Sequence, residues 1–281
     1  MDEVVFALAS AALFGAMTVA LRFALAQVPD AEGGALLTIL VALAVTLPVA
    51  ATGPVELVGT WPFVLAGLLG PGLSQLLFTL AVRDAGPSRT SVTVGTAPLF
   101  SVLVALVFLG EPLQAALAAG AILIVVGAML LVSEPGRPAH VKRIGLVLAL
   151  LATIVFAVRD NLVRHLSIET DVEPGLAAVA TLAAGALVVA LYLLLTRRAL
   201  PTEGLTAFVP AGVAFGLSYL CLFEAYYRGR VTVVSPLVAT ESLWGVMLSA
   251  LLLRRHELVG PRLFAGAALV VVGGALIGVF R

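Results

Sequence analysis

Residues 4–27 read VVFALASAALFGAMTVALRFALAQ, an apolar run in which Arg22 is the one charged residue. An α-helix rises about 1.5 Å per residue, so about 20 apolar residues cross the hydrocarbon core of a bilayer. The preceding residues are acidic and lack the basic flank of a secretory signal. The run therefore predicts a retained transmembrane helix.

The whole chain has the same apolar character. Of its 281 residues, 61% are hydrophobic and 11% are charged, and the mean hydropathy is +1.15. Soluble domains carry roughly 25% charged residues, so we expect a multi-pass protein of the plasma or inner membrane, surrounded by lipid. A formal net charge of zero disfavours a nucleic-acid partner. The single cysteine, Cys221, excludes an intrachain disulfide.

Charged and turn-forming residues divide the chain into ten apolar segments. The longest connection, SEPGRPAHVKR at 133–143, marks the midpoint. No segment alternates polar and apolar residues as β-barrel strands do, so the sequence predicts an all-α integral membrane protein. The segments are 4–27, 33–52, 60–82, 90–109, 113–132, 144–165, 174–196, 205–227, 232–253 and 262–280.

The two halves of the chain resemble each other. GLSQ at 72–75 matches GLSY at 216–219, an offset of 144 that also pairs Thr96 with Thr240. Other matched pairs, at offsets of 142 to 146, are Phe14 with Phe156, Arg22 with Arg164, Glu111 with Glu257, Gly120 with Gly266 and Gly127 with Gly273. Drifting offsets of this size are what small insertions leave in a duplicated chain.

Each repeat would hold five segments, an odd number, so the second repeat must begin on the opposite face of the membrane. This predicts ten transmembrane helices in two inverted five-helix repeats, residues 1–137 and 138–281. Inverted repeats are the architecture of many secondary transporters, which bind substrate near the midplane and work by alternating access.

The distribution of basic residues predicts the orientation. The positive-inside rule places the odd-numbered connections in the cytoplasm and both termini outside. The odd-numbered connections carry Arg22, Arg83, Arg89, Arg137, Lys142, Arg143, Arg197, Arg198, Arg254, Arg255 and Arg262, against Arg164, Arg228, Arg230 and Arg281 on the side of the termini.

The motifs of both halves resemble the EamA-type branch of the drug/metabolite transporter superfamily. Its pattern is EP, an apolar stretch, GE, and glycines nine and sixteen residues after that glutamate. Residues 97–127, APLFSVLVALVFLGEPLQAALAAGAILIVVG, place Pro98, Gly110, Glu111, Gly120 and Gly127 on the pattern. The second half places Glu241, Glu257, Gly266 and Gly273 on it.

Two departures from this pattern stand out. The EP pair is split, because Ala97-Pro98 keeps the proline and Glu241-Ser242 keeps the glutamate, and His256 replaces the glycine of GE. The resemblance implies a ten-helix transporter and covers the whole chain. It does not imply one substrate, since the family carries many.

Polar side chains inside the segments are the candidate substrate- or proton-binding residues, because burying them in lipid is costly. The first half offers Gln75 and Thr96, and the second offers Arg159, Asp160, Asn161, Tyr219, Glu224, Glu241 and Trp244. Pro98 and Pro236 are candidate hinges, since proline weakens a helix. The matched glycines are expected to pack segments five and ten together, and Glu111 and Glu257 to cap them.

Glu241 is the sharpest of these candidates, because the matched position in the first half is Ala97. Its charge state stays open: burial favours the neutral acid, whereas a cation such as Arg159 would hold it ionised. Helical neighbours point about 100° apart, so Arg159 and Asp160 are expected not to pair. Asp160 would then pair with Arg164, and Arg159 with Glu241 or Glu224. A salt bridge that only locks the second repeat is the alternative.

The sequence shows no phosphate-binding loop and no metal-ligand spacing. We therefore expect no cofactor and no metal, and a carrier instead of an enzyme. The three acids and one arginine within the segments favour export of amino-acid-like or amphiphilic cationic compounds in exchange for protons, by a monomer or homodimer. An uptake carrier, a facilitator and a lipid or glycolipid translocator remain open alternatives.

Overall fold

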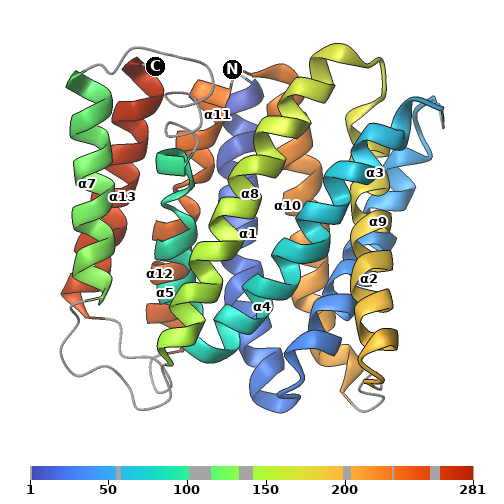
Figure 1. The fold of residues 1–281 in the computed structure, drawn as a ribbon, viewed down its shortest axis with the longest axis horizontal. Helices are drawn as coiled ribbons and strands as arrows, with labels where there is room; N and C mark the ends of the chain where they lie inside the picture. The colour runs from blue at the N-terminus through green and yellow to red at the C-terminus, as the bar shows by residue number, and fades with distance from the viewer. Residues whose placement is uncertain are drawn as a thin grey trace.

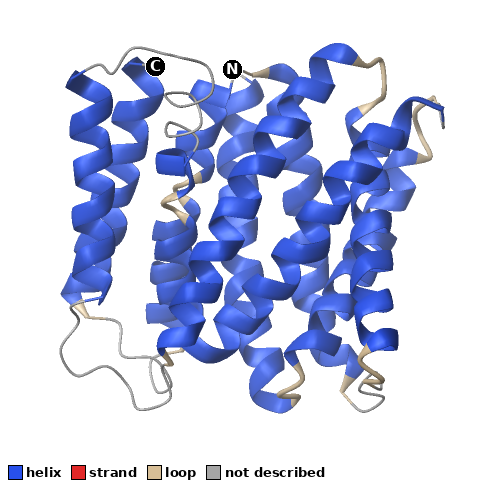
Figure 2. Ribbon diagram, in the orientation of Figure 1, coloured by secondary structure: helices blue, strands red, loops and turns tan. Residues whose placement is uncertain are grey.

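The computed structural model describes residues 2–54, 58–100, 115–132, 142–198, 204–229, 231–253 and 260–280. Within these ranges the secondary structure is helical and contains no strand (Figure 2). The apolar composition explains this, because a helix satisfies its own backbone hydrogen bonds, as a segment in lipid must. The all-α class is confirmed.

The elements follow the chain in two halves. The first half contains α1 (Asp2–Gln27), α2 (Ala31–Ala50), the 3-10 turn η1 (Val58–Thr60), α3 (Trp61–Gly67), the π-type turn η2 (Leu68–Leu73), α4 (Ser74–Ala85), α5 (Pro87–Val94) and α7 (Ala115–Val132). The second half contains α8 (Arg143–Glu169), α9 (Pro174–Leu195), the 3-10 turn η3 (Leu205–Phe208), α10 (Val209–Arg228), α11 (Val231–Val238), α12 (Glu241–Leu252) and α13 (Pro261–Phe280).

Local chemistry sets the helix boundaries. The Asp30 carboxylate accepts a hydrogen bond from the Gly33 N–H at 3.0 Å and so caps the start of α2. Gly86 separates α4 from α5 with φ at 84°, a left-handed conformation that favours glycine. Pro87 then opens α5, where its missing N–H costs nothing.

Seven helical stretches in the described ranges are long and apolar enough to cross a membrane. They are Asp2–Gln27, Ala31–Ala50, Trp61–Ala85, Arg143–Glu169, Pro174–Leu195, Thr206–Arg228 and Val234–Leu252, and Pro261–Leu276 is a shorter apolar helix. Helical residues occur in all ten predicted segments. The described residues support a multi-pass membrane protein but do not confirm ten crossings.

The helices of the two halves pack in matched pairs (Figure 1). α1 packs against α10 and α12, and α8, its counterpart in the second half, packs against α4 and α5. α7 packs against α13. Figure 1 shows α1 starting at the edge of the bundle where α13 ends, whereas α8 starts at the opposite edge.

The match between the halves extends to single contacts. Arg22 Nη1 donates to the Arg83 carbonyl at 3.3 Å, and the matched Arg164 donates from Nη1 to the Tyr226 carbonyl at 2.6 Å. Both carbonyls lie in the last turn of a helix, α4 or α10, where carbonyls lack intrahelical partners.

Glycines let α7 and α13 approach backbone to backbone. A Cβ atom on Gly273 would lie 2.6 Å from the Gly120 carbonyl oxygen, and one on Gly127 would lie 2.7 Å from that of Gly266. The predicted packing role of these glycines is confirmed. Gly110, Glu111 and Glu257 lie outside the described residues.

Aromatic side chains fill the centre of the bundle. The Phe14 ring centroid lies 5.1 Å from that of Phe78, 5.9 Å from that of Phe156 and 6.3 Å from that of Phe215. Apolar side chains also cover the outer surface, where Leu195 and others are exposed. An apolar outer surface is what contact with lipid requires.

Candidate functional site

Two helical segments are broken at matched positions. A turn at Gly95–Thr96 separates α5 from the helical residues 97–100. A turn at Ala239–Thr240, 144 residues later, separates α11 from α12. The breaks also pack together, because a Cβ on Gly95 would lie 2.8 Å from the Ser242 Cβ.

Threonine hydroxyls satisfy carbonyls beside both breaks. Thr96 Oγ1 donates to the Thr93 carbonyl at 2.6 Å, and the matched Thr240 Oγ1 donates to the Leu237 carbonyl at 2.6 Å. The predicted hinges lie close by, since Pro98 follows the first break and Pro236 precedes the second. A broken helix in a membrane needs such partners for its backbone.

A small cavity that contains three charged side chains in a largely apolar lining lies beside the second break. It offers about 40 Å³ to the centres of water molecules, which is room for about three waters. The lining combines charged, hydroxyl and aromatic side chains from α1, α8, α10 and the two broken segments. The lining residues are Ser10, Phe14, Val94, Ala97, Phe156, Arg159, Asp160, Leu222, Tyr226, Ser235, Val238, Ala239 and Glu241.

Arg159 is the buried cation of this cavity, with 3% of its surface exposed. Its Nε lies 2.8 Å from Asp160 Oδ1, and its Nη1 donates to the Tyr219 hydroxyl at 2.6 Å. The expectation that Arg159 and Asp160 do not pair is therefore wrong. The arginine side chain is long enough to bend back to its neighbour despite the helical angle. Arg164, the partner expected for Asp160, instead donates to the Tyr226 carbonyl.

Neighbouring rings and a glycine hold the guanidinium in place. Arg159 Cζ lies 5.3 Å from the ring centroid of Phe156 and 5.1 Å from that of Tyr219, within the range of cation–π attraction. The chain is not helical at Gly70, inside η2, and a Cβ there would lie 3.1 Å from Arg159 Cγ. The kink between α3 and α4 thus leaves room for the arginine.

Glu241 is the buried acid of the cavity, with 4% of its surface exposed. It begins α12, where the helix dipole favours a negative charge. Its Oε1 has no hydrogen-bond partner, and within the described residues no ion pair joins it to Arg159. The Tyr226 hydroxyl is also buried and interacts with Asp160. The cavity therefore presents the unpaired Glu241 oxygen to whatever enters it.

Two polar residues predicted for the site point elsewhere. Glu224 Oε2 lies 2.6 Å from Arg228 Nη2, one turn along α10. Asn161 Nδ2 donates to the Ala157 carbonyl at 2.8 Å, within α8. Neither residue lines the cavity.

Three more predicted residues lie outside the lining. Trp244 is 36% exposed, and its Cβ would lie 2.7 Å from a Cβ on Gly15. Gln75 is buried on α4, with Nε2 4.0 Å from Met17 Sδ. Thr96 donates its hydroxyl to the Thr93 carbonyl beside the first break. The structure thus brings together Arg159, Asp160 and Glu241, with Tyr219 bound to the arginine.

The lining also contains residues that the sequence analysis did not propose for the site, among them Phe14, Tyr226 and Ser10. Phe14 is the repeat match of Phe156, and both rings line the cavity. Tyr226 follows Tyr219 by seven residues, which places both on one face of α10. These two signals were present in the sequence. Ser10 had no such signal, since it is an ordinary small residue in an apolar helix.

Comparison with known proteins gives a family match and matches to solved structures. The sequence matches the EamA-like transporter family over residues 2–133 and 143–279. A protein of known crystal structure, 21% identical in sequence, superimposes with a TM-score of 0.68, covering 98% of this chain and 95% of that one. At that identity the likeness shows the fold alone. No curated protein matches the sequence.

Proposed function

Because the chain belongs to the EamA-like transporter family, a family of membrane transporters in the drug/metabolite transporter superfamily, we propose that it exports small organic amines in exchange for protons. The substrates are amino-acid-like or amphiphilic cationic compounds. The observation that carries this proposal is Glu241, a buried carboxylate that lines the cavity with one oxygen lacking a protein partner.

The charges of the cavity support a cationic ligand. Arg159 and Asp160 form an ion pair and so offset each other. Glu241 is then the group left to accept either a proton or an ammonium group, and a buried carboxylate needs one of the two. Binding of substrate and binding of a proton at the same carboxylate would couple the two fluxes.

The matched helix breaks support alternating access. Transporters with inverted repeats bind substrate beside discontinuous helices near the interface of the repeats. We assign the repeats to residues 1–137 and 138–281, with Pro98 and Pro236 as hinges. Support comes from the matched contacts of Arg22 and Arg164 and from the opposite directions of α1 and α8. We place the protein in the cell membrane as a monomer or homodimer.

Flux measurements test the proposal. The purified protein in proteoliposomes is supplied with labelled amines, amino acids and amine-free carboxylates of similar size, with and without a pH gradient. We expect a pH gradient to drive flux of the amine-bearing compounds and not of the amine-free acids. Gradient-independent flux would favour a facilitator, and flip-flop of labelled lipid alone would favour a lipid translocator. Either outcome would contradict proton-coupled export.

A further inference from the structure

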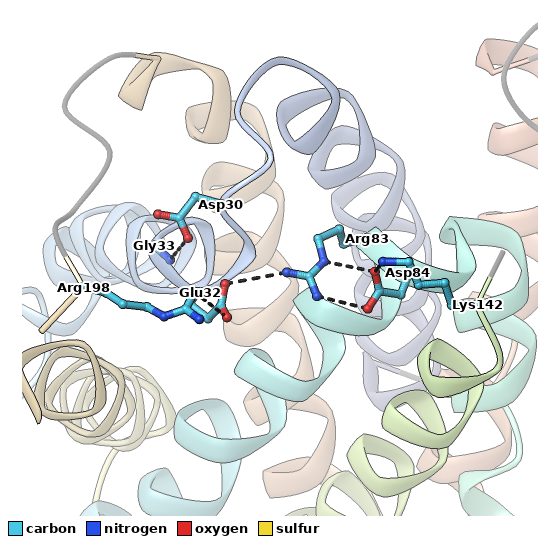
Figure 3. Close-up of polar contacts among 7 residues, drawn as sticks. All are labelled: Asp30, Glu32, Gly33, Arg83, Asp84, Lys142 and Arg198. Atoms are coloured by element: carbon cyan, nitrogen blue, oxygen red, sulfur yellow. Dashed lines mark hydrogen bonds and ion pairs between the residues drawn. The ribbon is translucent and has the colours of Figure 1, made fainter. Parts of the chain in front are cut away.

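Five charged side chains form a continuous ionic chain at one edge of the bundle (Figure 3). Arg198 Nη1 lies 2.8 Å from Glu32 Oε1, and Arg83 Nη1 lies 3.7 Å from Glu32 Oε2. Arg83 also binds Asp84 with two hydrogen bonds of 3.1 and 3.0 Å, and Lys142 Nζ reaches Asp84 Oδ1 at 3.1 Å.

The ionic chain crosses between the two halves of the molecule twice. Glu32 lies in the first turn of α2, and Arg83 and Asp84 lie in the last turn of α4. Arg198 follows α9 and Lys142 precedes α8, so both belong to the second half. Glu32–Arg198 and Asp84–Lys142 are therefore ion pairs between the halves.

The backbone is also close at one of these links. The Lys142 N–H donates to the Asp84 carbonyl at 2.7 Å. A Cβ on Gly145 would lie 2.6 Å from the Ala85 nitrogen, so only a glycine lets the start of α8 rest on the end of α4. The two halves are in contact at this edge.

Among the residues that the structure describes, the ion pairing between the halves is looser at the opposite edge. Within the described residues, the ion pair between halves at that edge joins Arg228 Nη1 to Asp2 Oδ2 at 4.0 Å, with side chains 47% and 77% exposed. The cavity is nearer to this second edge, since Ser10 lies in the first turns of α1 and Tyr226 in the last turn of α10.

We propose that Glu32, Arg83, Asp84, Lys142 and Arg198 form an ionic latch that closes one mouth of the transport path and must break in each cycle. This inference rests on the proposed function only in that it requires alternating access. In the resting state of the carrier, the latch is formed and the transport path is closed at this edge.

Burial within the latch predicts which substitutions open it. The carboxylate side chains are buried, at 9% exposed for Glu32 and 6% for Asp84, whereas those of Arg198 and Lys142 are 51% and 65% exposed. Removing Arg198 or Lys142 leaves a buried carboxylate with Arg83 as its remaining cation in the latch, and water from an open mouth can then supply part of the lost solvation. Removing the carboxylate abolishes both the attraction and this penalty. Loss of a cation should therefore open the latch more than loss of its acid.

Distance measurements between spin labels test the latch. The exposed residues Gln27 and Thr196 flank it, one in each half. Labels are attached to Gln27→Cys and Thr196→Cys in a full-length Cys221→Ser background. We expect Arg198→Gln to raise the population of longer distances about fivefold or more. Glu32→Gln should raise it less.

Four further variants give the controls. Lys142→Gln should raise the population of longer distances as Arg198→Gln does, because it removes the ion pair between Lys142 and Asp84. Asp84→Asn removes the same ion pair and should have a smaller effect. The double variant Glu32→Gln/Arg198→Gln should lie closer to the parent than Arg198→Gln alone. Arg228→Gln, at the opposite edge, should leave the distances unchanged.

Unchanged distances in both cation variants, with the protein still folded by size exclusion, would overturn the latch. Additive effects of Glu32→Gln and Arg198→Gln on the measured distances would also overturn the latch. The distance measurement needs no substrate. A failed flux assay with shifted distances would thus refute the proposed substrates and leave the latch standing.

Discussion

At the scale of single residues, the sequence predicted the charged residues that line the cavity better than it predicted their partners. Arg159, Asp160 and Glu241 stand out because charged groups are rare in apolar segments, and all three line the cavity. Their pairing could not be predicted from helical angles, because the rotamer of a long arginine side chain depends on rings and hydroxyls from other helices. Glu224 does not line the cavity and instead pairs with Arg228, one turn along α10.

Tyr219 and Tyr226 provide a matched test of how Arg159 is held. Tyr219→Phe removes the hydroxyl that accepts from Arg159, and a hydrogen bond to a charged group contributes about 1.5–3 kcal/mol. Tyr226→Phe leaves this hydrogen bond intact and removes a buried hydroxyl that interacts with Asp160. We expect Tyr219→Phe to lower the apparent Tm in detergent at a fixed scan rate, and Tyr226→Phe to lower it less. Equal losses in the two variants would contradict this geometry.

At the scale of elements, the sequence located the interrupted helices but not the breaks themselves. Pro98 and Pro236 marked the two segments. The turns lie at Gly95–Thr96 and Ala239–Thr240, where threonine hydroxyls and close packing with the other broken segment stabilise them. Such contacts depend on the neighbouring helix, so the sequence around each break does not predict them.

Pro236→Ala tests whether the second break moves during transport. Alanine restores a backbone donor to α11 just before the break, and one hydrogen bond of about 1 kcal/mol would slow turnover about fivefold. We expect the maximal flux to fall and KM to change less. Pro210→Ala is the control, because Pro210 occupies the first turn of α10, where no intrahelical bond is lost. Unchanged turnover in Pro236→Ala would argue against a hinge at this break.

At the scale of the whole molecule, the repeat was predictable because helix order and matched residues survive in both halves. Its contacts confirm the matches of Arg22 with Arg164 and of the paired glycines. The ionic latch was not predictable, since its five residues come from four separate segments that only the fold brings together. Charged residues at segment ends also look like ordinary solvated termini in a sequence.

Cysteine labelling tests the predicted orientation of the bundle. In a Cys221→Ser background, Asp2→Cys reports the edge where α1 starts and Thr196→Cys reports the edge of the latch. The positive-inside rule places the latch edge in the cytoplasm. A membrane-impermeant maleimide should therefore label Asp2→Cys in intact cells, and Thr196→Cys only after permeabilisation. The reverse pattern would invert the orientation and place the latch at the outer face of the membrane.

The most direct test of the central claim is amine flux driven by a pH gradient, measured for the parent protein and Glu241→Gln in the same proteoliposomes. Glu224→Gln is the matched control, because its carboxylate pairs with Arg228 away from the cavity. The account predicts that the parent and Glu224→Gln respond to the gradient. Glu241→Gln, folded and reconstituted to the same level, should show a gradient-driven flux at least about tenfold lower than the parent, equivalent to about 1.4 kcal/mol. Parent-like driven flux in Glu241→Gln would contradict the account.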